Sequence, residues 1–193
     1  MNLNFNAILA EHPETTQLVV VEASGIRADV ILMEKNGNDW AETHRAEGWI
    51  GKLGVGEHKE GVPTTPEGLY TFGVAFGLKE NPGTAFSYTQ VDDSHYWVDD
   101  PNSVHYNQFL SSPGGGDWKS AEHLIDQPVA YSYALSLNYN LECIPEKGSA
   151  IFFHCTTNGP TAGCIAVPEA DMTHFLQVLK TDACIYIPPL AEV

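Results

Sequence analysis

The chain has 193 residues and a formal net charge of −16 at pH 7, from 9 Lys and Arg against 25 Asp and Glu. This length is enough for one sizeable hydrophobic core, and no linker rich in Ser, Gly and Pro divides the chain. We therefore expect an amino-terminal segment, residues 1–16, followed by a single domain over residues 17–193. Nucleic acids and anionic membrane surfaces require clustered Lys and Arg, so the composition excludes both as ligands.

Apolar stretches bounded by turn residues predict strands along most of the chain. The first two, residues 17–23 and 27–35, are rich in Val, Ile and Leu, and Asn36-Gly37-Asn38 supplies the turn that follows them. A meander is the simplest arrangement for them. Further strands are expected at residues 68–77, 95–99, 128–139, 148–154 and 183–187.

Helices are scarcer, and the clearest one is expected to start at Pro168. Acidic residues occupy its first turn, and its apolar face consists of Met172, Phe175, Leu176 and Leu179. A shorter helical turn is expected at residues 120–126. Many short strands with one or two short helices indicate a mainly β fold with a closed or sandwiched core.

The amino end shows no export signal. Residues 1–11 have no basic start and no apolar stretch of signal-peptide length, and no later segment is long and apolar enough to span a bilayer. The four cysteines lack the paired spacing of a zinc module, so we expect neither a metal nor another cofactor. Cys184 lies in an apolar run and is expected to be a buried strand residue.

A histidine ends one apolar run, and a cysteine opens the next. The first run, residues 148–154, ends in His154, and Cys164 follows Gly163 at the start of the second. Residues 156–160 are expected to turn the chain back so that His154 and Cys164 face each other. The pair is then a thiol nucleophile and its base, which either forms an ion pair or takes the thiol proton during attack.

The loop before the cysteine supplies two more candidate site residues. Gly163 lets a substrate approach the backbone closely, and the amides of Gly163 and Cys164 are candidate donors to an oxyanion. Thr161 is expected to orient this loop.

The tetrad Thr161-Ala162-Gly163-Cys164 resembles the catalytic stretch of the YkuD-type L,D-transpeptidases. The usual form in that family is Ser-His-Gly-Cys followed by an apolar residue and arginine. Here Ala162 replaces the histidine and Ala166 replaces the arginine, as in a branch of the family with Thr-Ala-Gly-Cys. The resemblance spans about residues 49–187 and includes residues 51–52, 64–70, 76–77, 97–101, 106–107 and 121–124.

This resemblance implies a β sandwich or barrel and a cysteine L,D-transpeptidase that crosslinks the bacterial cell wall and so influences cell shape. Its partners would be peptidoglycan stem peptides, which acylate Cys164 to give a thioester that an amine opens. Because peptidoglycan is crosslinked outside the cytoplasm, the expected location is the periplasm or cell wall. With alanine in place of the family arginine, recognition of a carboxylate falls to Lys52, Lys59 or backbone amides.

Other side chains are candidates for holding the imidazole of His154 or for lining the substrate groove. A backbone carbonyl often holds the imidazole in the family, and Glu122 and His123 are the rival side chains. Glu122 is alternatively an exposed residue on a short helix. His58, in the loop of residues 56–61, is expected to be solvated. The candidates for the groove, with core packing as their alternative, are Tyr70, Trp97, Tyr106 and Asn107.

Three other functions stay open beside transpeptidation. An L,D-carboxypeptidase would open the same thioester with water, and a wall-binding module would keep the fold without turnover. A metal-dependent hydrolase would need His154, Cys155, Cys164 and either His123 or His58. Strand alternation disfavours this set, because it points Cys155 away from His154.

Overall fold

The computed structural model describes residues 4–189, and short strands dominate it. The strands are β1 (Gln17–Ser24), β2 (Arg27–Asn36), β3 (Asp39–Trp49), β4 (Val55–Gly56), β5 (Thr65–Pro66), β6 (Gly68–Gly77), β7 (Tyr88–Gln90), β8 (His95–Val98), β9 (Phe109–Ser111), β10 (Ala121–His123), β11 (Ala134–Leu137), β12 (Phe152–Cys155), β13 (Ile165–Val167) and β14 (Cys184–Ile187). The helices are α1 (Phe5–Ile8) and α2 (Glu169–Val178), with 3₁₀ turns η1 (Leu124–Asp126) and η2 (Ala130–Ser132). The predicted mainly β fold with one or two short helices is confirmed.

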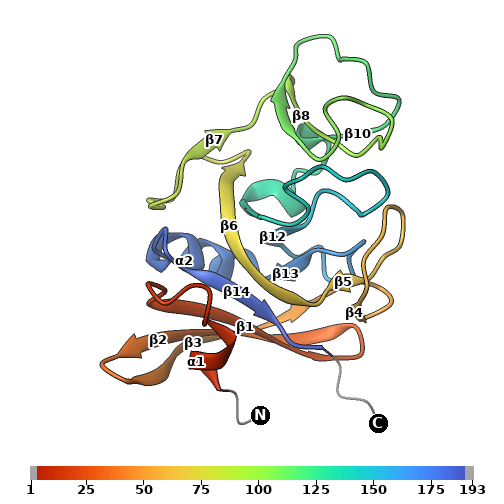
Figure 1. Ribbon diagram of the computed structural model, residues 1–193. Coiled ribbons are helices and arrows are strands. Elements are labelled where there is room, and N and C mark those ends of the chain that lie inside the picture. The colour runs from red at the N-terminus through yellow and green to blue at the C-terminus, as the bar shows by residue number, and fades with distance from the viewer. Residues whose placement is uncertain (1–3, 190–193) are drawn as a thin grey trace.

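The main sheet closes on itself. Its nine strands are hydrogen-bonded in the order β11-β12-β13-β3-β2-β1-β14-β6-β7, and β6 also pairs with β11. Without β7, the remaining eight strands therefore form a closed, barrel-like ring. Figure 1 shows β6 as a long curved strand that runs from the side of β14 toward the end of the molecule that carries β8 and β10.

The first three strands form the expected meander. Val19 and Val21 belong to the main core, whereas Leu18 and Val20 lie in a second apolar cluster on the opposite face. This alternation is the pleat of a strand covered on both sides, which explains the continuous apolar run. Gly37 makes the turn into β3 at a φ of +63°, where glycine has no steric cost. The sequence did not predict β3, because this strand is rich in charged residues.

Residues 4–16 pack on the outer face of this meander. Leu9 joins the second apolar cluster, and the ring of Phe5 lies 5.4 Å from that of Trp40. The amide and hydroxyl of Thr16 both donate to Oδ2 of Asp182, at 2.9 and 2.7 Å. The described part of the amino-terminal segment is thus docked on the strands that follow it.

The helix predicted at Pro168 is confirmed with a shift of one residue. Pro168 is the N-cap, so α2 begins at Glu169. Phe175 is fully buried and its ring meets that of Phe153 in β12 edge-on, at 5.0 Å between centroids. Helix α2 therefore covers one face of β12, and the other face of that strand is left for the site.

Three expected elements are wrong in their details. The strand expected at residues 128–139 is reduced to β11 (Ala134–Leu137) and preceded by η2, because the amide of Tyr131 donates to the carbonyl of Gln127 at 2.8 Å and turns the chain there. Residues 120–126 form β10 and η1 rather than a single helical turn, because β10 pairs with β8 and this tertiary pairing overrides local preference. The strand expected at residues 148–154 starts only at Phe152. Gly148 and Ala150 have φ values of +103° and +54°, which bend the chain before the strand.

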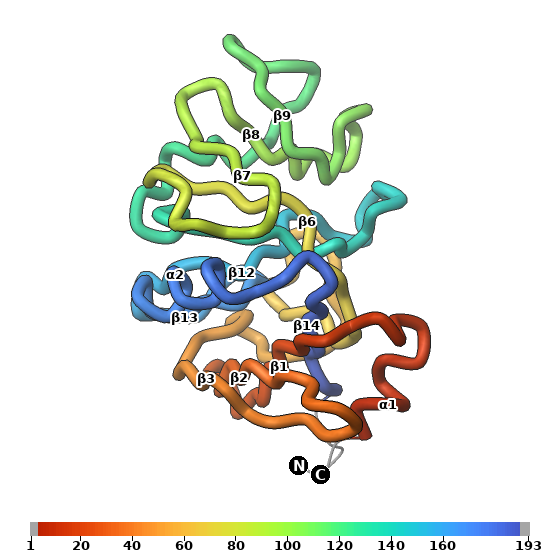
Figure 2. The backbone as a smooth tube through the Cα atoms, turned by 90° about the vertical axis from the view of Figure 1, so that its left-hand side faces the viewer, coloured from red at the N-terminus to blue at the C-terminus, as the bar shows by residue number. Residues whose placement is uncertain are grey.

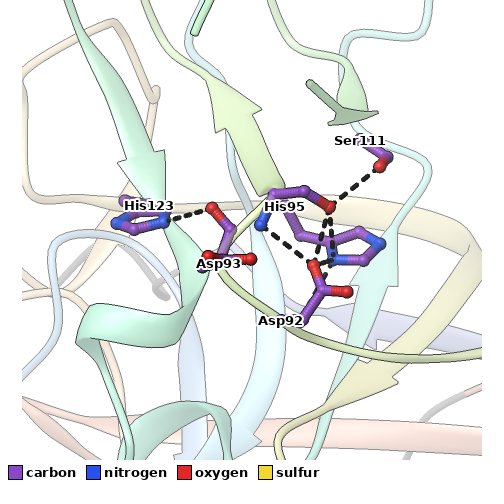
Figure 3. A network of polar contacts seen from close by, with 6 residues as sticks. Asp92, Asp93, His95, Ser111 and His123 are labelled. Carbon is purple, nitrogen blue, oxygen red and sulfur yellow. Dashed lines mark hydrogen bonds and ion pairs between the residues drawn. The ribbon is translucent and has the colours of Figure 1, made fainter. Parts of the chain in front are cut away.

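Strands β8, β9 and β10 form a separate three-stranded sheet at the end of the molecule opposite to β1–β3 (Figures 1 and 2). A polar network ties the loop before β8 to its neighbours (Figure 3). His95 Nδ1 lies 2.7 Å from Asp92 Oδ1, and Nε2 of His123 lies 2.9 Å from the carbonyl oxygen of Asp93. The network therefore connects the loop before β8 to His123 of β10.

Candidate active site

Strands β12 and β13 run parallel, which corrects the expected reversal of the chain. His154 pairs with Ala166 in this register. Residues 156–164 therefore return the chain to the start of β12 instead of forming a hairpin. This path is fixed because the amide of Thr161 donates to the carbonyl of Ile50 at 2.9 Å. Cys164 consequently lies beside Phe152 and not directly opposite His154.

Cys164 and His154 nevertheless lie on the same face of the sheet. Cys164 and Phe152 belong to one apolar cluster with Tyr131, whereas Cys155 belongs to the main core on the other face. The ring of Tyr131 lies 5.6 Å from that of Phe152 and 5.7 Å from the imidazole of His154. The prediction that Cys155 points away from the site is confirmed.

Backbone groups hold the thiol of Cys164 on two sides. Its Sγ donates to the carbonyl oxygen of Ala150 and accepts from the amide of Phe152, both at 3.3 Å. Ala150 has a left-handed backbone, and its amide donates to Oδ1 of Asn107 at 3.1 Å. The carbonyl that binds the thiol proton is therefore itself held in place by Asn107.

A backbone carbonyl orients the imidazole of His154. Nδ1 lies 2.8 Å from the carbonyl oxygen of Cys155. A carbonyl oxygen only accepts, so Nδ1 carries the ring proton and Nε2 presents its lone pair. Neither of the rival side chains, Glu122 and His123, makes this contact.

Burial keeps both partners neutral at rest. It lowers the pKa of His154 to about 4. Burial, and then the nearby charge of Glu122, raise the pKa of Cys164 well above its ordinary range. The resting structure therefore favours a neutral thiol and a neutral imidazole over the ion pair, one of the two states expected from the sequence.

A cavity of about 290 Å³ opens onto Cys164. Four ionisable side chains share its lining with the thiol, namely His58, Glu60, Asp99 and Glu122. A larger hollow, of about 520 Å³, lies on the strands β1 to β3 beside Arg27 and Glu47, and Cys164 does not line it. His154 is among the described lining residues of neither hollow. The smaller cavity is therefore the candidate site, because the thiol of Cys164 lines it.

Glu122 is a half-buried strand residue, which corrects its alternative reading as an exposed residue on a helix. It lies in β10, and the hydroxyl of Tyr131 donates to its Oε2. Burial raises the pKa of Glu122 to about 7, against the opposing effect of the Tyr131 hydrogen bond. Its carboxyl group therefore changes charge near neutral pH, close to the thiol of Cys164.

His58 is also buried, which corrects the expectation of a solvated loop residue. Nδ1 lies 2.6 Å from the carbonyl oxygen of Thr64, and the ring meets that of Tyr139 edge-on at 5.6 Å. Burial lowers the pKa of His58. The cavity thus contains a neutral imidazole that is distinct from His154.

Thr161 closes the loop around Cys164. Its Oγ1 donates to the carbonyl oxygen of Cys164 at 2.6 Å and accepts from the amide of Gly163 at 3.1 Å. The Gly163 amide is thus used within the loop, which leaves the Cys164 amide as the candidate oxyanion donor. A Cβ at Gly163 would lie 3.0 Å from the carbonyl oxygen of Thr64, so the close approach requires glycine.

Trp97 and Asn107 make internal contacts. Nε1 of Trp97 donates to Oδ1 of Asn107 at 3.0 Å, and its ring lies 4.8 Å from that of Phe152. Nδ2 of Asn107 donates to the carbonyl oxygens of Tyr139 and Asn140. The amide of Asn107 therefore organises loops behind the cavity.

The other predicted groove residues support the site from outside. The hydroxyl of Tyr106 donates to Glu60 Oε2 at 2.5 Å and accepts from the amide of Gly148, and that of Tyr70 donates to the carbonyl of Glu67. His123 points to Asp93, as Figure 3 shows. None of the five residues Tyr70, Trp97, Tyr106, Asn107 and His123 is among the described residues that line the cavity of Cys164.

Glu60, Asp99 and Ala150 were not predicted as site residues, although all three lie in segments that carried other predictions, Ala150 in the run of residues 148–154. Asp99 falls in residues 97–101 and Glu60 in the loop of residues 56–61. Their position within motif-rich segments was the available signal. Within residues 4–189, no group of three or more His, Cys, Asp or Glu side chains is placed to hold a metal ion. Over the same range, no helix has the length and apolar character needed to cross a membrane.

The sequence matches the family model of the YkuD L,D-transpeptidase catalytic domain over residues 29–187. The chain belongs to the YkuD family. The matched range contains His154, Cys164 and every described residue that lines the cavity of Cys164. The family expected from the tetrad is thus confirmed. No curated protein sequence matches the chain.

Three solved structures resemble this YkuD-family chain. Bd1075 of Bdellovibrio bacteriovorus gives a TM-score of 0.50 at 16% identity and covers 90% of this chain and 48% of its own. The helical cell shape determining protein Pgp2 of Campylobacter jejuni gives a TM-score of 0.49 at 14% identity and covers 98% of this chain and 57% of its own. Mycobacterium tuberculosis L,D-transpeptidase 1 gives a TM-score of 0.43 at 14% identity and covers 91% of this chain and 63% of its own.

The chain spans 48% to 63% of the length of these three solved chains. At 16% identity the likeness to Bd1075 concerns the fold alone. The match to the family model confirms the L,D-transpeptidase type of fold expected from the sequence.

Proposed function

We propose that this YkuD-family protein is a cysteine L,D-transpeptidase that acts on peptidoglycan stem peptides in the periplasm or cell wall. One observation carries the proposal. The thiol of Cys164 lines a cavity and shares a sheet face with His154, whose Nδ1 is bound to the carbonyl of Cys155 and whose Nε2 is left as a base. A nucleophile, a base and a group that orients the base are the parts that acyl transfer needs.

The reaction has two steps. As Sγ of Cys164 attacks the stem-peptide carbonyl, Nε2 of His154 takes the thiol proton and then gives it to the leaving amine. The carbon–nitrogen bond breaks, and a thioester on Cys164 remains. An acceptor amine attacks this thioester, the carbon–sulfur bond breaks, and the sulfur recovers a proton. The new amide bond is the crosslink.

The charge of the cavity favours an amine as the acceptor. Glu60, Asp99 and Glu122 line it, and none of its described lining residues is Lys or Arg. Such a wall attracts a positively charged amine and repels a carboxylate. With Ala166 in place of the family arginine, the site also lacks that cation for binding a substrate carboxylate.

The experiment supplies a stem tetrapeptide donor with and without an amine acceptor and identifies the products by mass spectrometry. We expect the crosslinked product with the acceptor, and its loss in Cys164→Ala but not in Cys143→Ala, which removes a cysteine outside the cavity. A shortened peptide as the sole product, whatever the acceptor concentration, would instead identify an L,D-carboxypeptidase. Binding of the peptide without any product would identify a wall-binding module.

A further inference from the structure

The cavity of Cys164 contains a second imidazole that the activation of the thiol does not use. Nδ1 of His58 is bound to the carbonyl oxygen of Thr64 at 2.6 Å, so the ring proton is on Nδ1. Nε2 therefore carries a lone pair, and it makes no hydrogen bond within residues 4–189. His58 is 7% exposed and lines the same cavity as the thiol. It can accept a proton there.

Two glycines fix the ring of His58 beside the cysteine loop. A Cβ at Gly163, the residue before Cys164, would lie 3.0 Å from Cε1 of His58. A Cβ at Gly148 would lie 2.3 Å from Cδ2 and 2.7 Å from Nε2. No side chain fits at either position without moving the imidazole. The backbone on both sides of the cavity is thus shaped around this ring.

The position of His58 also compensates for the alanine in the tetrad. Where the usual YkuD stretch has a histidine, this chain has Ala162, which lines the same cavity. His58 comes from a different loop and places an imidazole beside Gly163. The cavity therefore keeps a second imidazole although the tetrad lacks one.

Three carboxyl groups line the same cavity as this imidazole, those of Glu60, Asp99 and Glu122. Oε2 of Glu60 accepts from the hydroxyls of Tyr106 and Ser149, at 2.5 and 2.8 Å. Oδ1 of Asp99 is buried and has no hydrogen-bond partner in the described part of the chain. An ammonium ion is a donor of the right charge for such a wall. An amine bound there arrives protonated and must lose a proton before it can attack.

We propose that His58 is the catalytic base of the second step, an inference that rests on the proposed function. The acceptor ammonium gives one proton to Nε2 of His58, and the free amine attacks the thioester carbonyl. The carbon–sulfur bond breaks as the amide forms. The second proton of the nitrogen passes through His154 to the sulfur of Cys164, and His58 releases its proton to water. The first step thus uses His154 alone, and the second step needs His58 in addition.

The test separates the two steps in His58→Asn and His58→Gln. Asn keeps a donor near the position of Nδ1, and Gln keeps a hydrogen-bonding group near that of Nε2, but neither amide takes up a proton. Acylation is followed by intact mass after addition of a carbapenem, which mimics the donor. Transfer is followed with two acceptors, an alkylamine that is protonated at neutral pH and methoxyamine, which is not. His105→Asn, outside the cavity, is the matched control.

We expect both His58 variants to form the carbapenem adduct within about twofold of the wild-type rate. Transfer to the alkylamine should fall about 100-fold, as expected for the loss of a general base. Transfer to methoxyamine should stay within about threefold, because this acceptor has no proton to lose before attack. A merely structural role of His58 would lower transfer to both acceptors alike.

Three results would overturn the assignment. They are wild-type transfer to the alkylamine in both variants, an equal loss with the two acceptors, and loss of the carbapenem adduct in both variants. Failure of the proposed function gives a different pattern, since the wild-type protein itself would then form no adduct and no transfer product.

Discussion

At Cys164 the resting structure stabilises the thiol rather than the thiolate. The S–H group donates to the carbonyl oxygen of Ala150, and a half-buried carboxyl group, Glu122, lines the same cavity. Both features oppose ionisation, and His154 is a weak base because it is buried. Binding of a substrate carbonyl thus has to supply the driving force for proton transfer, which limits reaction with unrelated electrophiles.

Glu122 makes the reactivity of the thiol dependent on pH. With a pKa of about 7, its carboxyl group is protonated in mild acid and charged in mild base, and the charge raises the pKa of Cys164. Replacing Glu122→Gln should therefore leave thiol reactivity unchanged at pH 5.5 and raise it about three- to tenfold at pH 8.5. The measurement is the rate of reaction with dipyridyl disulfide in a Cys143→Ala background, with the product mapped to Cys164.

The matched control is Glu142→Gln, at an exposed loop position. It should change the rate at neither pH. An equal increase at both pH values for Glu122→Gln would show that the substitution loosens the cavity and that the charge of Glu122 does not control the thiol.

The active face of β12 depends on the helix packed against its other face. Phe175 of α2 is fully buried and meets Phe153, while Phe152 and His154 of the same strand face Tyr131. Replacing Phe175→Ala should lower the free energy of unfolding by about 3 to 5 kcal/mol through the cavity that it leaves. Urea unfolding measures this. The neighbouring Thr173→Ala should cost less than about 1 kcal/mol, and equal costs would contradict the packing described for α2.

The elements that the sequence predicted best are those with strong local signals. The strands β1, β2 and β6 and the helix α2 have continuous or periodic apolar patterns, and their bounds agree within about two residues. Strand β3 was not predicted, because its own residues lack a strand pattern and its pairing with β2 and β13 stabilises it. Strand β10 was read as a helical turn, since its pairing with β8 has no trace in its own three residues.

Across the whole molecule, closure of the barrel brings the site together. His154 and Cys164 could be predicted because both lie within one motif, residues 148–168. His58, Glu60, Asp99 and Glu122 come from three other segments, and only the pairing of distant strands places them around one cavity. No local sequence pattern indicated that these four residues would line one cavity. For the same reason Glu122 and His58 were read as exposed residues, although Glu122 is half-buried and His58 is buried.

The net charge of −16 has a local counterpart in this cavity. Three of its lining residues are acidic, and none of the described ones is Lys or Arg. The surface charge excludes polyanionic ligands, and the cavity charge favours an amine. The net charge of the chain and the charge of the cavity therefore both fit the amine acceptor proposed above.

The most direct test of the central claim is the intact mass of the protein after incubation with a carbapenem. If Cys164 is the nucleophile, the wild-type protein gains the mass of one adduct, Cys164→Ala gains none, and Cys184→Ala, which removes a buried cysteine of β14, still gains one. An unmodified wild-type protein, or an adduct that persists in Cys164→Ala, would contradict the claim.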